Sequence, residues 1–477
     1  MLRIAKARQY SRAIALAALS GLTATGPARA ATTDPTGSLT GKASGLTSDQ
    51  VAKKATATSF AAAEKRHEVE AAVANVRSAL YDFLPRLNVS ASYFRLSKLE
   101  ASPIGNVVVA PGAAAGPLAP GQQLVAAPIQ FDGPRNATTF SAAFTLPLSD
   151  YVFRLCQSRD SAKAQLEGSQ LLLEATRRKV AYDARALYYD WVRAELNAVV
   201  AAQNLSLGEE HLSRLQAMAA ADSAAPADVA RVEATVAASE QVLAQARNLA
   251  ALQMERVAIA MHDSTRRDYQ IGEDLSAAPS ERGAPNEIAQ LTLLAEQRRP
   301  ELKGAQLKAL AYEKGADAGF SRVLPRLDAI AQGTFANPNQ RYFPPADEFH
   351  TSWQVGVQLS LSPTDNLIAK SQVRMARELA AGALAERGQL LDAVRMEVAE
   401  AVLAERTAQA GLKSSARRLS AAETSYRSRR ERFQVGQATT VELTEAQTEL
   451  FNARLDAIQA QVAIRLARAR IAYVTGS

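Results

Sequence analysis

Two kinds of hydrophobic pattern alternate along this chain, and the change from one to the other falls at a proline. Up to Phe83 the apolar residues recur at the spacing of a helix, whereas after Pro85 the odd-numbered positions 87–93 are apolar and the even-numbered ones are polar. Alternation with a period of two indicates a β-strand. Proline lacks an N–H group and disfavours helical geometry in the residue before it. The pattern therefore predicts a helix from about Ser48 to Phe83, with Pro85 as a helix-to-strand boundary.

The same change occurs a second time, in the second half of the chain. A helix predicted for residues 286–324 is stopped by Pro325, the second helix-to-strand boundary, and positions 327–335 alternate. In each half another alternating segment follows, at residues 139–148 and again at residues 353–361. The sequence thus predicts two β-hairpins, one in each half.

The loop of the first hairpin is unusually long, spanning about residues 98–137. It contains six prolines and shows neither helical nor strand periodicity; these prolines are Pro103, Pro111, Pro117, Pro120, Pro128 and Pro134. Such composition cannot bury enough apolar surface to order itself. We expect an exposed loop without regular structure.

Each hairpin precedes a very long helical segment. Residues 156–221 and 366–433 contain no proline and almost no glycine, and at ~1.5 Å per residue each helix would extend roughly 100 Å. Each then reaches a short break and a return helix of roughly 35–40 residues. The recurrence of this order predicts an internal duplication, with repeat 1 at about 48–265, repeat 2 at about 286–475 and an irregular linker at 266–285.

The first thirty residues have the organisation of a secretory signal peptide. A basic start (Arg3, Lys6, Arg8 and Arg12) precedes an apolar run, and Ala28-Arg29-Ala30 has the form of a cleavage site. The alternative, a membrane anchor, would need a longer apolar run.

The first thirty residues also account for most of the net positive charge. They carry five basic side chains and no acidic one, so their removal lowers the formal net charge from +7 to +2. The remaining chain has no basic block typical of nucleic-acid binding, and its single cysteine, Cys156, excludes an internal disulfide.

The four predicted strands have the length and the single apolar face of outer-membrane strands. The alternative is a soluble four-stranded sheet covered by helices. Four strands cannot close a barrel, and an open edge in lipid leaves backbone groups unpaired. Two protomers would supply eight strands, whose bore side chains fill, whereas three would supply twelve and enclose a water-filled lumen.

The segment FQVGQATTVELTEAQTELFNARLDA, residues 433–457, together with the duplicated order of hairpin, long helix and return helix, resembles the TolC family of outer-membrane channel proteins. The resemblance covers essentially all of the chain after residue 30. It implies a mostly α fold with a membrane β-barrel portion: a homotrimer with a twelve-stranded barrel in outer-membrane lipid, continued by an α-helical periplasmic tunnel. It further implies an inner-membrane ABC transporter and a periplasmic adaptor protein as partners. Within the family, the resemblance extends to members that export a large adenylate cyclase toxin, so the implied cargo is an exported polypeptide.

Two acidic residues follow the second turn between helices. Glu442 and Glu445 are three residues apart and hence share a helix face. By the resemblance they occupy the positions that line the tunnel entrance, so a trimer would present an acidic ring of six carboxylates that attracts cations. The alternative for Glu442 is a capping box with Thr439, which is compatible with a place in the ring.

The resemblance also implies contacts that hold the entrance closed, and here the chain departs from the family pattern. Asp228 matches an aspartate of the first return helix, but the position of its tyrosine partner is Phe433, which has no hydroxyl group. A family arginine beyond the turn is replaced by Ala438. Arg430 or Arg432 is the candidate substitute for the missing contact.

No residue pattern indicates catalysis. The four histidines are far apart and none belongs to an HExxH motif; they are His67, His211, His262 and His350. We expect no enzyme activity and no cofactor. Two further alternatives are left open: an outer-membrane channel for small-molecule efflux, and a periplasmic coiled-coil adaptor or structural protein.

Overall fold

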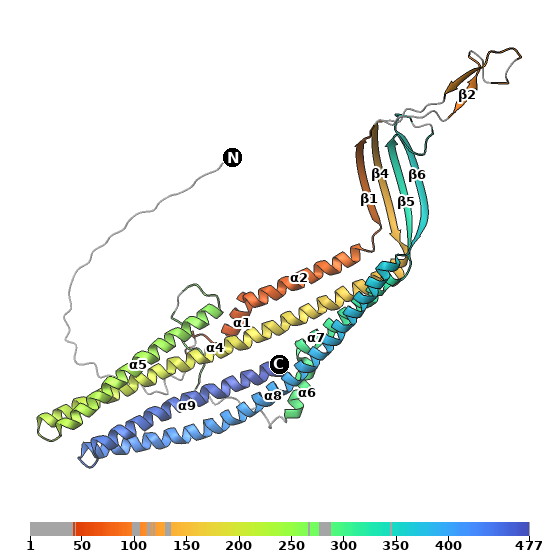
Figure 1. Cartoon of the computed structure of the whole chain (residues 1–477). Coiled ribbons are helices and arrows are strands. Elements are labelled where there is room, and N and C mark those ends of the chain that lie inside the picture. The colour runs from red at the N-terminus through yellow and green to blue at the C-terminus, as the bar shows by residue number, and fades with distance from the viewer. Residues whose placement is uncertain are drawn as a thin grey trace, which may run out of the picture.

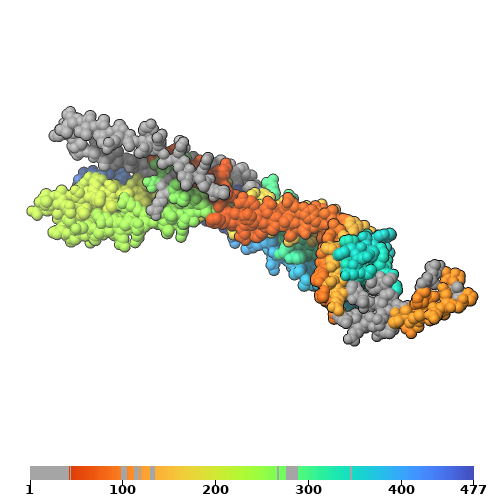
Figure 2. Space-filling view, turned by 90° about the horizontal axis from the view of Figure 1, so that it is seen from above, coloured from red at the N-terminus to blue at the C-terminus, as the bar shows by residue number. Residues whose placement is uncertain are grey.

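The computed structural model describes residues 42, 44–97, 105–111, 116–117, 120–128, 135–265, 268–275, 288–343 and 346–476. The predicted signal peptide, residues 1–30, lies outside them. The described residues form an elongated molecule with a β-sheet at one end and long helices that extend away from it (Figure 1, Figure 2). Among the described residues, no helix is both long enough and apolar enough to cross a bilayer.

The two halves of the chain contain the same main elements in the same order, and the first half has β2, β3 and α3 in addition. The first half contains α1 (Ser48–Thr58), α2 (Phe60–Tyr81), β1 (Arg86–Arg95), β2 (Asn106–Val109), β3 (Val125–Pro128), β4 (Asn136–Pro147), α3 (Leu148–Phe153), α4 (Leu155–Ala220) and α5 (Pro226–Ala260). The second half contains α6 (Ile288–Arg298), α7 (Pro300–Phe320), the 3₁₀ turn η2 (Ser321–Val323), β5 (Arg326–Asn337), β6 (His350–Ser360), α8 (Pro363–Gln434) and α9 (Thr440–Val474). Each half thus has two shorter helices, two long strands, a very long helix and a return helix.

Both boundary prolines lie where helix gives way to strand. Pro85 precedes the first residue of β1, and Pro325 precedes the first residue of β5. The long helices α4 and α8 begin and end within about three residues of the predicted limits. The mostly α architecture with two hairpins is therefore confirmed.

The two helices that precede the hairpins are each broken once, which corrects the continuous helices expected there. Ser59 is extended, with φ −60° and ψ 127°, and its side chain accepts a hydrogen bond from the N–H of Ala62, so it caps a new helix. In the second half Arg299 is extended because Pro300 follows it and disfavours helical geometry. Pro300 is therefore the local sequence signal for this break.

The long loop of the first hairpin was expected to have no regular structure, but it contains two short strands. β2 and β3 pair antiparallel, from Asn106 opposite Pro128 to Val109 opposite Val125. The valines of this segment are β-branched and favour extended backbone. This small hairpin lies beyond the end of the main sheet (Figure 1).

The main sheet has the order β1-β4-β5-β6, and every neighbouring pair is antiparallel. The pairing of β4 with β5 joins the two halves, and β1 and β6 form the edges. One register row crosses all four strands through Leu87, Phe144, Ala331 and Val355, so the apolar positions share one face. Six side chains on this face are more than two-thirds exposed: Leu87, Val89, Trp353, Val355, Val357 and Leu359.

The helices form two antiparallel hairpins, α4 with α5 and α8 with α9, and α4 also packs against α2, α7 and α9. The largest buried cluster surrounds Tyr188, Trp191 and Val192 of α4 and includes Met261 and Ile458. The Tyr188 hydroxyl donates to the carbonyl of Leu46 at 2.8 Å. The core therefore lies along α4, where both hairpins meet.

Replacing Trp191 tests this location of the core. Trp191 is 1% exposed, so Trp191→Ala should lower the free energy of unfolding by about 3–5 kcal/mol through lost burial and the cavity left behind. Leu252→Ala, at a side chain that is 50% exposed on α5, is the matched control and should have a much smaller effect. Urea unfolding followed by circular dichroism measures both. Equal effects of the two substitutions would contradict this assignment of the core.

Candidate functional site at the tip of the helical hairpins

The turns of both helical hairpins lie at the end of the molecule farthest from the sheet (Figure 1). The first turn is closed by Asp222 at φ 53° and by Pro226 at the start of α5. The second turn contains Gly436 at φ +73°, a conformation that side chains rarely adopt. These turns bring Asp228, Phe433 and Glu442 to the same end of the molecule.

Glu442 forms the capping box predicted for it. The Thr439 hydroxyl accepts a hydrogen bond from the Glu442 N–H at 3.2 Å, and the Glu442 carboxylate accepts one from the Thr439 N–H at 2.8 Å. Arg429 forms an ion pair with the same carboxylate at 3.0 Å. The backbone hydrogen bond from Thr439, its hydroxyl and the nearby Arg429 and Arg432 lower the pKa of Glu442. The cap thus keeps this carboxylate charged.

Glu445 lies one turn further along α9 and is exposed. Its carboxylate has no hydrogen-bond or ion-pair partner among the described residues. The capping role therefore belongs to Glu442 alone, and the place of both glutamates in an acidic entrance ring remains a prediction.

Phe433 has a packing role at the tip. It is 6% exposed and belongs to a cluster that draws on all four long helices, with Leu215 of α4, Val232 and Val236 of α5, and Leu443 of α9. Ala438 packs against the edge of this cluster. The phenyl ring that replaces the expected tyrosine thus holds the two helical hairpins together by burial instead of by a hydroxyl contact.

The predicted contact of Asp228 is not formed within the described chain. Asp228 is half-buried in the first turn of α5, where a carboxylate is favourable, but no hydrogen bond or ion pair joins its side chain to another described residue. Arg432 is exposed. Arg430 instead donates to Glu210 of α4 at 2.7 Å. The substitution of Arg430 or Arg432 for the missing entrance contact stays a prediction.

Several contacts between the two hairpins were missed by sequence reasoning because the partners are more than 200 residues apart. Besides Arg430 with Glu210, the Gln447 amide donates to the backbone carbonyl of Asn204 at 3.0 Å and to its side chain at 3.2 Å. Gln447 is only 7% exposed. A glutamine on the apolar face of a helix was the signal that could have indicated a buried polar link.

His211 is a buried titratable group at the same junction. Its ring packs edge-on against Phe433, with 5.0 Å between the ring centroids, and its exposed fraction is 7%. Its Nε2 atom has no hydrogen-bond partner among the described residues. Burial, followed by the positive charge of Arg214, lowers the pKa of His211. The imidazole therefore stays neutral at pH values where an exposed histidine would already be charged.

Acidification should weaken the junction through His211. Because the folded pKa lies below the unfolded value of about 6.5, the unfolded chain binds the proton first, and stability is lost as pH falls from that value through the folded pKa. The urea midpoint of the wild-type protein should therefore fall more between pH 7.5 and pH 5.5 than that of His211→Phe. His67→Phe, at an exposed histidine, is the control. The same pH dependence in wild type and His211→Phe would contradict the assignment.

No three histidine, cysteine, aspartate or glutamate side chains are grouped in a way that could hold a metal ion, as far as the described residues extend. The geometry at the tip is instead that of a packed and charged junction between two coiled coils.

Comparison with known proteins identifies the fold. Residues 291–477 match the family model described as outer membrane efflux protein. A comparison with curated protein sequences gave no match. Among solved structures, the outer-membrane channel OprN is 20% identical with a TM-score of 0.68, covering 93% of this chain and 95% of that one.

Two further solved structures agree. VceC, an outer membrane protein of Vibrio cholerae, is 16% identical with a TM-score of 0.70 over 90% of this chain and 96% of its own. The open state of the MtrE outer membrane channel of Neisseria gonorrhoeae is 14% identical with a TM-score of 0.71 over 90% and 89%. The chain has the fold of the TolC-like outer-membrane channels, and its second half matches the outer membrane efflux protein family.

Proposed function

We propose that three copies of this chain form the outer-membrane exit duct of a tripartite export machine. The observation that carries this proposal is the four-stranded sheet, which exposes one continuous apolar face and whose edge strands, β1 and β6, have no further neighbour among the described residues. Apolar side chains at this density on a surface need a lipid or protein partner. Lipid in contact with the apolar face accounts for its exposure.

The edges determine how many copies are needed. A strand edge in lipid must be paired, because unpaired backbone groups cost several kcal/mol each. Pairing β6 of one copy with β1 of the next joins unlike edges and closes into a ring. Three copies supply twelve strands and a water-filled lumen, whereas two would supply eight and a bore filled by side chains.

The long helix α8 also exposes apolar side chains that neighbouring copies could cover. On α8 the exposed apolar side chains of Ile368, Met375, Met396 and Leu403 lie at separations that are multiples of seven. Heptad spacing is the pattern by which helices pack along their length in coiled coils. Neighbouring copies that cover this stripe would continue the barrel as a helical tunnel toward the periplasmic tip.

The tip then forms the entrance. In a trimer, Glu442 and Glu445 would contribute six carboxylates at the narrow end of the tunnel. The lowered pKa of Glu442 supports a permanent charge there. A ring of carboxylates favours cations and positively charged segments of a passing polypeptide.

The cargo that we propose is a large toxin-like polypeptide, delivered by an inner-membrane ABC transporter through a periplasmic adaptor protein. The resemblance of residues 433–457 to toxin-exporting channels supports this assignment. The description of the matched family as an efflux protein supports a second candidate, the export of small molecules such as drugs. A periplasmic adaptor role is disfavoured by the exposed apolar face of the sheet.

Neutralising the proposed ring tests the entrance. The double substitution Glu442→Gln with Glu445→Gln should reduce the cation selectivity of single channels in a planar bilayer, because six charges are lost at the narrowest point. Glutamine also supports a capping box, so the turn should stay folded. Glu233→Gln with Glu240→Gln, two exposed glutamates of α5, removes the same charge elsewhere. Reversal potentials that are unchanged by the first pair, or changed equally by both pairs, would exclude the ring.

Deleting the gene tests the cargo. If the proposal is right, mass spectrometry of culture supernatants should show the loss of one large polypeptide, and reintroducing the gene should restore it. A deletion strain with an unchanged supernatant but increased sensitivity to drugs or dyes would favour the small-molecule candidate instead.

A further inference from the structure

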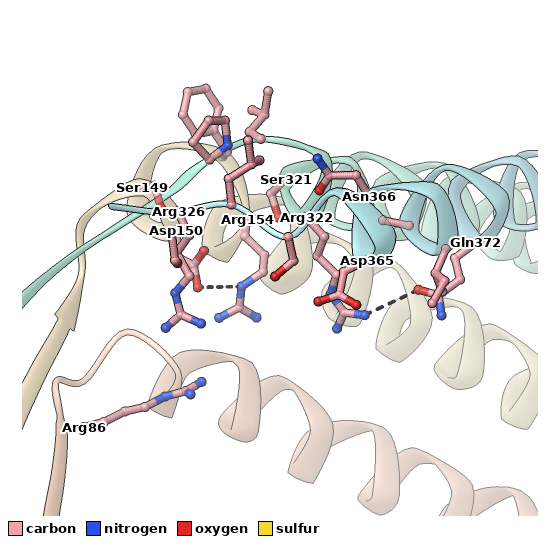
Figure 3. A pocket seen from close by; sticks show the side chains of 18 residues that line it. Arg86, Ser149, Asp150, Arg154, Ser321, Arg322, Arg326, Asp365, Asn366 and Gln372 are labelled. Atoms are coloured by element: carbon pink, nitrogen blue, oxygen red, sulfur yellow. Dashed lines mark hydrogen bonds and ion pairs between the residues drawn. The ribbon is translucent and has the colours of Figure 1, made fainter. Parts of the chain in front are cut away.

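A polar cavity lies where the sheet meets the helices. Its volume is about 560 Å³, within the range of roughly 300–1,000 Å³ that is common for small-ligand sites. Four arginines line it, together with only two acidic residues: Arg86, Arg154, Arg322 and Arg326, with Asp150 and Asp365. Figure 3 shows the side chains of Arg154, Arg322 and Arg326 extending from one wall into the space that faces Arg86.

Two of these guanidinium groups are held in place by carboxylates. Arg154 donates to Asp150 at 2.9 Å and lies 3.7 Å from Asp82. Arg326 donates to Asp328 at 2.9 Å. These pairs orient both arginines and balance much of their charge.

The other two arginines have no carboxylate partner. The side chain of Arg86, the first residue of β1, forms no hydrogen bond or ion pair with any described residue. Arg322 donates only a long hydrogen bond of 3.4 Å to the amide oxygen of Gln372. Asp365 is the remaining acidic residue of the lining, and one carboxylate cannot neutralise two guanidinium groups. With Asp82 and Asp328 included, four aspartates balance the four arginines in formal charge, but they pair with only two of them. Arg86 and Arg322 therefore keep several N–H donors without a carboxylate partner.

The register of the sheet indicates which side the cavity opens to. Arg326 lies directly opposite Ser360, and Arg86 lies opposite Thr145. These positions alternate with the apolar ones, so they belong to the polar face of the sheet, together with Asn88. In the proposed barrel the polar face lines the lumen and the apolar face contacts lipid.

We propose that this cavity binds the anionic group of a solute or cargo in the lumen, a phosphate or a carboxylate, with Arg86 and Arg322 as the residues that contact it. Guanidinium groups present paired donors that match both of these anions. The assignment to the lumen rests on the proposed function, whereas the anion site itself does not. In a trimer, three such sites would follow the acidic entrance along the export path, where the tunnel joins the barrel.

Isothermal titration calorimetry on the full chain in a detergent with neutral head groups tests the site, with inorganic tripolyphosphate as the probe. Wild-type protein should bind it at low salt. Arg86→Gln with Arg322→Gln should raise the dissociation constant about tenfold or more, since two charge-assisted contacts are lost. Arg231→Gln with Arg247→Gln removes two exposed arginines of α5 and should leave binding nearly unchanged. No binding by wild type, or equal weakening by both pairs, would overturn the proposal.

Two further measurements separate this site from the function on which its placement rests. In planar bilayers, tripolyphosphate should block wild-type channels and should block the Arg86→Gln with Arg322→Gln channels only at higher concentration. Channels that conduct but are never blocked would refute the lumenal site and leave the exit duct intact, whereas calorimetric binding without conductance would refute the exit duct and leave the anion site intact. Native mass spectrometry that finds a phospholipid bound to wild type and lost from the double variant, without tripolyphosphate binding, would assign the cavity to a lipid headgroup and overturn the proposal.

Discussion

The open edges of the four-stranded sheet are the constraint on which the rest of the structure depends. Within the described chain β1 and β6 each have one neighbour, so one row of backbone N–H and C=O groups on each lacks a ladder partner. In water such edges favour association, and in lipid they are not tolerated. The same sheet exposes its apolar face. A partner must therefore supply both a strand edge and an apolar surround, and under the proposed function copies of this chain in a membrane would provide the two together.

The prolines at positions 85 and 325 connect this constraint to the helices. Each stops one hydrogen-bond ladder just before another begins, so the chain changes from helix to strand within a few residues. The cavity of arginines lies at this change, and the capped glutamate and the buried Phe433 lie at the far end of the helices. Under the proposed function, a solute would pass acidic groups first and basic groups later. A cargo that carries charge of one sign would be attracted by only one of these two groups of side chains, so it would not be bound tightly along the whole path.

Much of the fold followed from local pattern. Alternation at residues 353–361 and the proline-free stretches around α4 and α8 predicted strands and helices near their observed limits, because periodicity records which face is buried. The breaks at Ser59 and Arg299 are decided by single residues within helical patterns, and the β2–β3 hairpin is a short pairing within a proline-rich loop. Neither kind of feature changes the spacing of apolar residues over a long stretch, so hydrophobic periodicity did not reveal it.

The candidate site was predictable to a smaller extent. The Thr439 and Glu442 cap has a local sequence signature, and it was found. The links of Glu210 to Arg430 and of Asn204 to Gln447 join distant residues, and the packing of His211 on Phe433 depends on the approach of two helical hairpins. Such contacts are set by tertiary structure. The pairing of β4 with β5 across the two halves belongs to the same class.

Disulfide cross-linking between the two edge strands tests the central claim most directly. With Cys156 replaced by serine, one cysteine is placed at Ser90 of β1 and a second is moved along the polar-face positions of β6, from Ser352 to Gln358. The account predicts that oxidation of membranes yields covalent dimers and trimers at one register of β6 and not at its neighbours. Chains that stay monomeric at every position of β6, or a ladder that continues beyond three copies, would contradict a closed trimer.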